Sequence, residues 1–143
     1  MIAIGSDHGG FEMKEAVKKY LLDKGLEVTD CGTYSLDSCD YPQFGKAVAH
    51  MVADGKAEKG IVVCTTGIGI SMAANKVKGV RCALCCEPLG AKMTRLHNDA
   101  NVLALGGKMI GINLAYEIVD TFLNTPFSAE EKHSRRVSQL EED

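Results

Sequence analysis

A cysteine stands between an apolar run and a glycine-rich turn near the middle of the chain. The stretch 60–76 reads GIVVCTTGIGISMAANK, so Cys64 is followed by Thr65, Thr66 and the turn 67–69. The run before the cysteine is typical of a buried strand, and the residues after the turn are typical of a helix. Amide groups at a helix start stabilise a thiolate, which can act as a base or nucleophile. The simpler alternative, which position alone favours, is that Cys64 fills the core as a small apolar residue.

The glycine-rich turn is itself a candidate anion site. In the segment 66–71 the glycines let backbone amides converge on an oxyanion or a phosphate. A dinucleotide-binding fingerprint is the alternative, but it requires glycine or alanine where Met72 stands. The acidic residue expected at the end of the next strand is also misplaced, because Glu87 follows only after Cys86. The pattern therefore favours an anion-binding turn without a nucleotide cofactor.

Polar and titratable residues also lie beside other apolar runs. Asp7 and His8 follow the first run, and Lys108 follows the last one in a Gly-Gly-Lys stretch. His97 and Asn98 stand at the end of a helical pattern, just before that last run. Each has an ordinary alternative: an aspartate after a strand often caps a helix, and His97 can be a surface histidine.

A basic cluster lies within the acidic C-terminal part of the chain. Its members are Lys132, His133, Arg135 and Arg136. A solvated helix face is the default interpretation of such a run. Phosphate binding is the sharper hypothesis, since arginine offers a bidentate fork.

Apolar runs alternate with amphipathic helical patterns along the whole chain. The predicted strands span 1–5, 26–30, 60–64, 80–86 and 102–105. The predicted helices span 11–24, 43–54, 70–76, 88–96, 110–123 and 129–142. This alternation predicts right-handed βαβ units, hence an α/β fold with a Rossmann-like, doubly wound, five-stranded parallel sheet and helices on both faces. Ligands bind at the carboxyl ends of such strands, so several of the polar stretches should share one rim. The last helix has little apolar surface and is expected to pack on a partner subunit.

Composition predicts one domain covering residues 1–143. Hydrophobic residues make up 45% and charged residues 24%, and the net charge of −3 gives no reason to expect nucleic acid or an anionic membrane as partner. No run approaches the roughly 18 apolar residues of a membrane span. The start of the chain lacks a signal-peptide pattern, so we expect a cytoplasmic protein whose six cysteines stay reduced.

Cys82 and Cys85 form a C-x-x-C pattern, but no metal site is expected from it. Zinc would need a second pair or histidines at ligand spacing. Residues three apart on a strand also point to opposite faces of the sheet.

Several of these stretches together resemble one protein family. The chain is similar, nearly end to end, to the type B ribose-5-phosphate isomerases and, through them, to the galactose-6-phosphate isomerase subunits. The stretches that carry the likeness are GSDHGGFEMK, DYP, VVCTTGIGISMAANK, GVRCAL, RLHNDANVLALGGKMIG and HSRRV. The resemblance implies an aldose–ketose isomerase of sugar phosphates that works through a cis-enediolate, without metal or cofactor. It also implies a homodimer with active sites shared across the interface, or a tetramer of such dimers.

The resemblance implies catalytic roles for three residues. Cys64 would be the base that moves a proton between C2 and C1. Thr66 would assist at the sugar oxygens, and His97 would open the furanose ring. The cradle for the enediolate would be the backbone of Thr65, Thr66, Gly67, Ile68 and Gly69.

Other residues are implied to contact the substrate. Asp7 and His8 resemble contacts at the ring end and the phosphate side, Asn98 a hydroxyl contact, and Tyr41 a pocket wall. The basic residues that match phosphate ligands, some of them from the partner subunit, are Lys108, Lys132 and Arg136.

Two features depart from the family pattern. Thr65 stands where many relatives have glycine, and lysine stands at 108 and 132 where arginine is common. Lysine presents a point charge, whereas arginine presents a bidentate pair of donors. The resemblance therefore determines the reaction type more firmly than the length of the sugar phosphate. The leading hypothesis is isomerisation of ribose 5-phosphate and ribulose 5-phosphate. The alternatives are a hexose 6-phosphate such as allose or galactose 6-phosphate, and a non-catalytic module that binds sugar phosphate.

Overall fold

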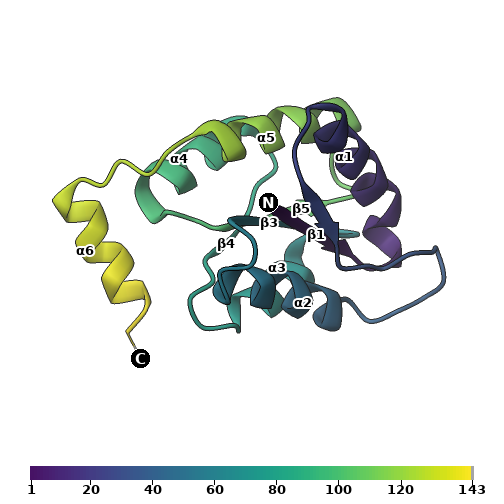
Figure 1. Ribbon diagram of the computed structural model, residues 1–143, viewed down its shortest axis with the longest axis horizontal. Coiled ribbons are helices and arrows are strands. Elements are labelled where there is room, and N and C mark those ends of the chain that lie inside the picture. The colour runs from purple at the N-terminus through teal and green to yellow at the C-terminus, as the bar shows by residue number, and fades with distance from the viewer. Residues whose placement is uncertain (143) are drawn as a thin grey trace.

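One parallel sheet of five strands lies at the centre of the fold, in the order β2-β1-β3-β5-β4 (Figure 1). The structure, a computed structural model, describes residues 1–142. The strands are β1 (Ile2–Ser6), β2 (Val28–Asp30), β3 (Lys59–Cys64), β4 (Cys82–Leu84) and β5 (Val102–Gly106). Every pairing between neighbouring strands is parallel. The predicted five-stranded Rossmann-like sheet is therefore confirmed.

Helices cover both faces of the sheet, as the strand–helix alternation predicts (Figure 1). The helices on one face are α1 (Phe11–Asp23), α4 (Pro88–Asn98) and α5 (Ile112–Asn124). Those on the other face are α2 (Tyr41–Ala53) and α3 (Ile68–Asn75). A short 3-10 turn (His8–Gly10) joins β1 to α1, and α6 (Glu131–Leu140) ends the described chain.

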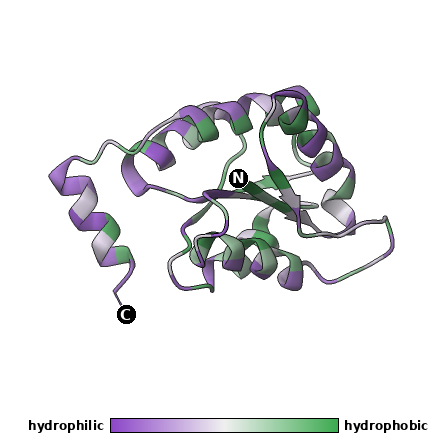
Figure 2. Cartoon of the chain, viewed as in Figure 1, coloured by the Kyte–Doolittle hydropathy of each residue, from purple (hydrophilic) through white to green (hydrophobic). Residues whose placement is uncertain are grey.

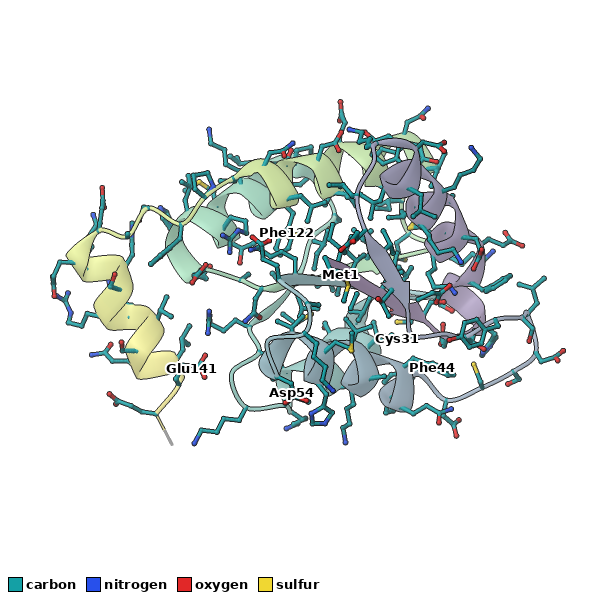
Figure 3. All side chains as sticks on the ribbon, in the orientation of Figure 1. Met1, Cys31, Phe44, Asp54, Phe122 and Glu141 are labelled. Carbon is teal, nitrogen blue, oxygen red and sulfur yellow. The ribbon has the colours of Figure 1, made fainter. Side chains whose placement is uncertain are left out.

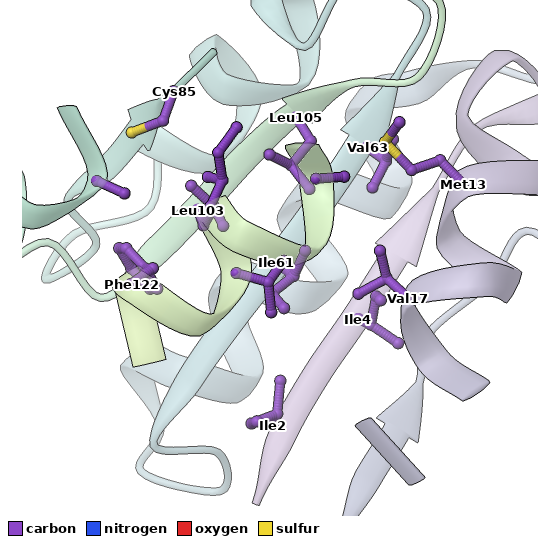
Figure 4. Close-up of a cluster of buried hydrophobic side chains, with 14 of the residues drawn as sticks. Ile2, Ile4, Met13, Val17, Ile61, Val63, Cys85, Leu103, Leu105 and Phe122 are labelled. Atoms are coloured by element: carbon purple, nitrogen blue, oxygen red, sulfur yellow. The ribbon is translucent and has the colours of Figure 1, made fainter. Parts of the chain in front are cut away.

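Each central strand divides its side chains between two cores. In β3, Ile61 and Val63 pack with α1 and α5, whereas Val62 and Cys64 pack with α2 and α3. Figure 4 shows the first of these cores, in which Phe122 of α5 packs near Ile61 and Leu103. Because both faces of the strands are covered, their sequences are continuously apolar rather than alternating.

The order of the strands reverses between β1 and β3, which are neighbours in the sheet. α1 leaves β1 on one face, and α2 leads into β3 on the other. In the register of the sheet, Ser6 pairs with Val63 and Cys64 pairs with Gly106. The carboxyl ends of β1, β3 and β5 therefore meet at one rim, beside the switch point where such folds bind ligands.

Every predicted boundary lies within two residues of the observed one, and β4 and α6 change most, each losing two residues at both ends. β4 is shortened from the predicted strand 80–86. Gly79 turns the chain there with φ 87°, and the Arg81 amide donates to the Asn101 side chain at 2.8 Å instead of joining a ladder. The strand is thus held to the three residues Cys82–Leu84 that pair with β5.

Two helices begin earlier than predicted. α2 starts at Tyr41 rather than 43, because Pro42 is accepted in a first helical turn, where its missing N–H has no partner to lose. α3 starts at Ile68 rather than 70, directly after Gly67.

The C-terminal helix α6 stands apart from the sheet and is mostly hydrophilic (Figures 1 and 2). The connection before it is held by the Ser128 amide, which donates to the Leu96 carbonyl at 3.2 Å. After the helix, Glu141 accepts from Arg81 Nη1 at 2.6 Å, and Figure 3 labels this glutamate below α6. Among residues 1–142, no helix combines the length and apolar character needed to cross a bilayer.

A buried lysine ties the end of β2 to α1. Lys14 Nζ is fully buried and donates to both carboxylate oxygens of Asp30, at 2.8 and 2.7 Å, and to the Thr33 carbonyl at 2.6 Å. Lys18 donates to the same carboxylate at 2.9 Å. Burial by itself raises the pKa of Asp30, but hydrogen bonds from Lys14, Lys18 and the Gly32 amide outweigh it and hold that pKa below its ordinary value. The ion pair therefore stabilises the fold while Asp30 is ionised.

Replacing Asp30 with asparagine should lower the free energy of unfolding by about 2 kcal/mol near pH 7, because Lys14 loses the carboxylate it contacts through both oxygens and keeps only the more exposed Glu15, 3.0 Å away, as an acidic partner. This is the low end for a buried pair, since 13% of the Asp30 side chain is exposed. A carboxyl whose pKa is lower in the folded state contributes fully above its unfolded pKa, near 3.9, and loses that contribution as the pH falls. Urea denaturation of both proteins should thus show a constant difference at neutral pH that shrinks below about pH 4. A difference that grows on acidification would contradict the assignment.

The matched control is Asp23→Asn, which removes an exposed ion pair with Lys19 on the same helix. That change should leave the stability nearly unaltered at every pH.

Candidate active site

Cys64 ends β3 with its sulfur directed at the start of α3. The Gly67 amide donates to Cys64 Sγ at 3.1 Å. Gly67 adopts a left-handed conformation with φ 80°, and a Cβ there would come within 2.5 Å of Leu84 and 2.8 Å of the Leu105 backbone. Cys64 is only 5% exposed, as a core-filling cysteine would be. A cysteine that only fills the core does not require a hydrogen-bond donor at its sulfur. The Gly67 amide is such a donor, and it is placed to stabilise negative charge on Cys64 Sγ.

The turn after Cys64 is held by bonds within it and by the loop after β5. Within the turn, Thr66 Oγ1 accepts from the Ile68 amide at 3.2 Å. From the β5 side, the Gly107 amide donates to the Cys64 carbonyl at 2.8 Å, and the Lys108 amide donates to the Thr65 carbonyl at 3.0 Å. The exposed Thr65 and Ile68 flank this turn. A fixed turn of this kind can bind an oxyanion through backbone amides that need not reorganise.

The loop after β1 packs against the same turn. A Cβ on Gly9 would lie 2.0 Å from Thr65 Oγ1, so the two loops touch at this point. Asp7 is buried, and its Oδ1 accepts from the Gly10 amide at 3.0 Å, which is the helix-capping role that the sequence left open. His8 is half-buried, and its Nδ1 accepts from the Cys39 amide at 3.2 Å.

Tyr41 forms a side of the site from the first turn of α2. A Cβ on Gly69 would lie 2.7 Å from its ring, so the aromatic face packs over the glycine-rich turn. The ring remains 40% exposed and so presents a wall beside the turn. We call this assembly the thiol rim. Its members are Asp7, His8, Tyr41, Cys64, Thr65, Thr66, Gly67, Ile68, Gly69 and Lys108.

The remaining predicted site residues form a second group, which we call the basic cavity. It has a volume of about 590 Å³. Its predicted members come from the end of α4 and from α6, and they are His97, Asn98, Lys132 and Arg136. Its other lining residues are Leu96, Ser128, Glu130 and His133.

His133 packs directly against His97 in this cavity. The two ring centroids are 4.4 Å apart with the planes tilted by 34°. Ser128 Oγ lies 2.7 Å from His133 Nδ1. Burial lowers the pKa of His133, and the neighbouring His97 lowers it further against the opposing effect of Glu130. His133 therefore favours the neutral form.

The thiol rim and the basic cavity lie at opposite edges of the sheet. A helix that follows a strand runs back along it, so α4 ends near the amino end of β5, whereas Cys64 pairs with Gly106 at the carboxyl end. Gly106 lies four residue steps along β5 from Val102, which is about 13 Å of strand. No residue of the turn 64–69 lines the basic cavity. One chain therefore brings the thiol, the turn, Asp7 and His8 together, but it does not bring His97 to them.

Apolar side chains are exposed around the thiol rim. Leu84 lies against Gly67, and Met109 lies against Gly106, where a Cβ would come within 2.9 Å of its side chain. The exposed apolar residues on these neighbouring elements are Ile68, Met72, Leu84, Leu89, Met93 and Met109. A patch that borders a site in this way is typical of a surface that another protein covers.

Two functional candidates were missed by sequence reasoning. His133 was noted only as part of a charged run, although its spacing from Arg136 places both on one helix face. Lys14 was passed over although it shares the spacing of Val17 and Leu21, the apolar stripe of α1. A lysine inside an apolar stripe is the signal that could have indicated a buried charge.

Cys82 and Cys85 point into different cores, as the strand geometry predicts. Burial raises the pKa of Cys82 to about 12 and that of Cys85 to about 11, so both thiols stay protonated at neutral pH. Within residues 1–142, no group of three or more His, Cys, Asp or Glu side chains is arranged to hold a metal ion.

Replacing Gly9 with alanine should lower the free energy of unfolding by about 2 kcal/mol, because the added Cβ overlaps Thr65 Oγ1. Adding Thr65→Gly removes the clashing atoms, so the double variant should recover most of that loss. Denaturant unfolding of the single and double variants measures this coupling. Gly111→Ala is the control, since no atom lies within 4 Å of its added Cβ. Additive losses in the double variant would show that the two loops do not touch.

Comparison with known proteins places the chain in one family. The sequence profile of the family described as Ribose/Galactose Isomerase matches residues 2–140. The chain is 44% identical to ribose-5-phosphate isomerase B of Escherichia coli (strain K12) over 139 residues, covering 97% of this chain and 93% of that one. It is 40% identical to galactose-6-phosphate isomerase subunit LacB of Clostridium acetobutylicum over 142 residues, covering 99% of this chain and 82% of that one. The crystal structure of a ribose 5-phosphate isomerase from Thermotoga maritima superposes with a TM-score of 0.97 at 51% identity, covering 99% of this chain and 97% of that one. The chain belongs to the ribose/galactose isomerase family.

Proposed function

We propose that this member of the family interconverts ribose 5-phosphate and ribulose 5-phosphate with Cys64 as the base. The observation that carries the proposal is the 3.1 Å bond from the Gly67 amide to Cys64 Sγ, at a strand end where loops from three strands converge. The names of the relatives in Escherichia coli and Thermotoga maritima support the five-carbon substrate. The six free thiols suit the reducing cytoplasm, where we expect the protein to act.

The reaction needs a base and oxyanion donors at the same place. The thiolate of Cys64 takes the proton from C2 of the open-chain aldose, and the electron pair moves to form the cis-enediolate. Within the turn 65–69, the Gly67 amide already donates to Cys64 Sγ and the Ile68 amide to Thr66 Oγ1, so the other amides of the turn meet the negative charge that develops on oxygen. The thiol then returns the proton to C1, while the Thr66 hydroxyl assists the transfer of a proton from O2 to O1. One hydrogen moves between carbons and one between oxygens, so the balanced reaction requires no oxidant and no cofactor.

We further infer that a second copy of the chain completes the site. The proposed ring-opening residue His97 lies at the other edge of the sheet from Cys64, so the two can act on one sugar only if they come from different subunits. Lys132 and Arg136 would then approach the phosphate from the partner, together with Lys108 from the same chain as the thiol. The apolar patch around the thiol rim supports an interface at this place.

A hexose 6-phosphate is the second candidate, and the relative named galactose-6-phosphate isomerase subunit favours it. The same thiol chemistry applies to either sugar, so pocket length decides between them. Thr65 and the lysines at 108 and 132 are the residues that bear on pocket length. Lysine contacts an anion as a point charge, so it constrains the position of the phosphate less than arginine would. Values of kcat/KM for both sugars distinguish the candidates, and a preference below about tenfold for the pentose would leave the five-carbon substrate unsupported.

Cys64→Ala should reduce kcat/KM about a thousandfold or more while leaving the fold intact, because the general base is lost. Proton NMR in deuterated water measures both turnover and deuterium entry at C2, and circular dichroism checks the fold. Cys82→Ala is the matched control, a half-buried thiol outside the site whose loss should leave turnover near wild type. Near-normal exchange in Cys64→Ala would refute the proposed base. Binding of sugar phosphate without any exchange in the wild type would instead establish a non-catalytic binding module.

A mixture of Cys64→Ala with His97→Asn should regain activity that neither variant has alone. In a mixed dimer with shared sites, one site receives both lesions and the other receives none. Random reassociation of equal amounts should therefore restore about a quarter of wild-type turnover. Mixed and unmixed samples are compared after mild dissociation and refolding. Activity that stays at the level of the separate variants would place both residues in a site within one chain.

A further inference from the structure

A backbone amide makes the shorter of the two contacts that hold His8. The Cys39 amide donates to His8 Nδ1 at 3.2 Å, and Cys39 Sγ lies 4.0 Å from the same nitrogen. A backbone N–H can only donate, so Nδ1 must offer a lone pair. The proton of the neutral imidazole is then on Nε2, the nitrogen that the Cys39 amide leaves free.

The segment that supplies this amide is anchored at its start. Lys14 Nζ donates to the Thr33 carbonyl and to Asp30. The Gly32 amide donates to Asp30 Oδ1 at 2.9 Å, and the Thr33 amide donates to the Ser6 carbonyl at 2.6 Å. These bonds fix residues 30–33 against β1 and α1, so the segment leaves the sheet in one direction.

The middle of the same segment is open to solvent. Residues 34–38 are exposed, and Tyr34 touches the anchor through its hydroxyl, which donates to the Asp30 carbonyl at 2.9 Å, and through its ring, 5.3 Å from Lys14 Nζ. An exposed stretch that contributes so few contacts cannot by itself hold Cys39 in register with His8. The anchor around Lys14 at one end and the start of α2 at the other must do so.

We propose that the Cys39 amide sets His8 as an Nε2–H hydrogen-bond donor to a substrate oxygen, and that Lys14 positions this donor through the anchored segment 30–39. The identification of the oxygen as one on a sugar phosphate rests on the proposed function. His8 binds as a neutral donor in this arrangement, and its other nitrogen is occupied by the amide. Lys14 is a positioning residue, because it touches the segment and not the substrate.

The tautomer is tested by NMR on the full chain without any substrate. Long-range correlations between ring nitrogens and ring protons, recorded about one and a half pH units above the ordinary histidine pKa near 6.5, report which nitrogen carries the proton. We expect His8 to be fully the Nε2–H form, and His8→Gln assigns its signals. Cys39→Ala keeps the amide and should keep this pattern, whereas Cys39→Pro removes the donor and should give a mixture of tautomers. An Nδ1–H pattern in the wild type, or an unchanged pattern in Cys39→Pro, would overturn the proposal.

The anchor is tested in the same spectra. Lys14→Met should loosen the segment, so His8 should show the mixed pattern and the Cys39 amide should lose its protection from hydrogen exchange. Lys19→Met is the control, an exposed lysine on the same helix, and should change neither signal. If Lys14→Met does not fold, Tyr34→Phe removes one bond to the same anchor and should raise the exchange rate of the Cys39 amide severalfold. Unchanged exchange and an unchanged tautomer in the folded anchor variant would refute the role of Lys14.

The donor role is tested by kinetics with ribose 5-phosphate. Gln places an N–H near the position of Nε2, so His8→Gln should keep KM within about threefold, whereas His8→Asn should raise KM about tenfold. Lys14→Met should raise KM about fivefold with kcat changed less than twofold, and it should have no further effect in the His8→Asn background. An effect of Lys14→Met on kcat alone, or full additivity with His8→Asn, would contradict the positioning role. A wild-type protein that isomerises no sugar phosphate would overturn the proposed function, while the NMR result would still decide the tautomer.

Discussion

The left-handed backbone of Gly67 is the constraint on which the site depends. With φ 80° the residue turns its amide back to Cys64 and starts α3 in the next residue. A side chain at this position would strike Leu84 and the backbone of Leu105, so only glycine permits the close approach of the turn to β5. One conformational requirement thereby places the thiol, the amide donor and the helix start within the five residues 64–68. The proposed base and the proposed oxyanion cradle share a single local cause.

The rest of the rim keeps this turn in place through backbone bonds. The β5 loop holds the carbonyls of Cys64 and Thr65, and the β1 loop packs Gly9 against Thr65. Bonds between main-chain groups lose no side-chain freedom when they form, so such a rim can be rigid without large side chains. Preorganised donors of this kind act on developing charge without reorganisation, which suits a proton transfer next to a carbonyl. The parallel register of β1, β3 and β5 is what brings the three loops to one place.

The sequence predicted the sheet well because its strands are covered on both faces and therefore read as unbroken apolar runs. It also predicted the thiol rim, since residues that follow parallel strands must share an edge. The position of His97 at the opposite edge also follows from the predicted alternation, because a helix that follows a strand in a parallel sheet runs back to the amino ends of the strands. The contact of His133 with His97 depends on how α6 is placed by Ser128 and Arg81, far along the chain. The hydrogen bonds of Lys14 could not be predicted from the sequence for a similar reason, because its partners Asp30 and Thr33 lie outside α1.

The separation of the two groups on one chain has a geometric consequence for any assembly. In a two-fold symmetric dimer each contact occurs twice, so a chain that offers a thiol rim at one edge and a basic cavity at the other can form two identical complete sites. Such a proposed dimer would account for the composition of α6, which has little apolar surface to bury on its own sheet and instead holds Lys132 and Arg136 beside His97. The same proposed arrangement would cover the exposed apolar side chains beside the thiol rim, among them Ile68, Leu84 and Met109. A closed interface at this patch would exclude water from the thiol and its amides, and exclusion of water strengthens every electrostatic interaction on which the proposed chemistry relies.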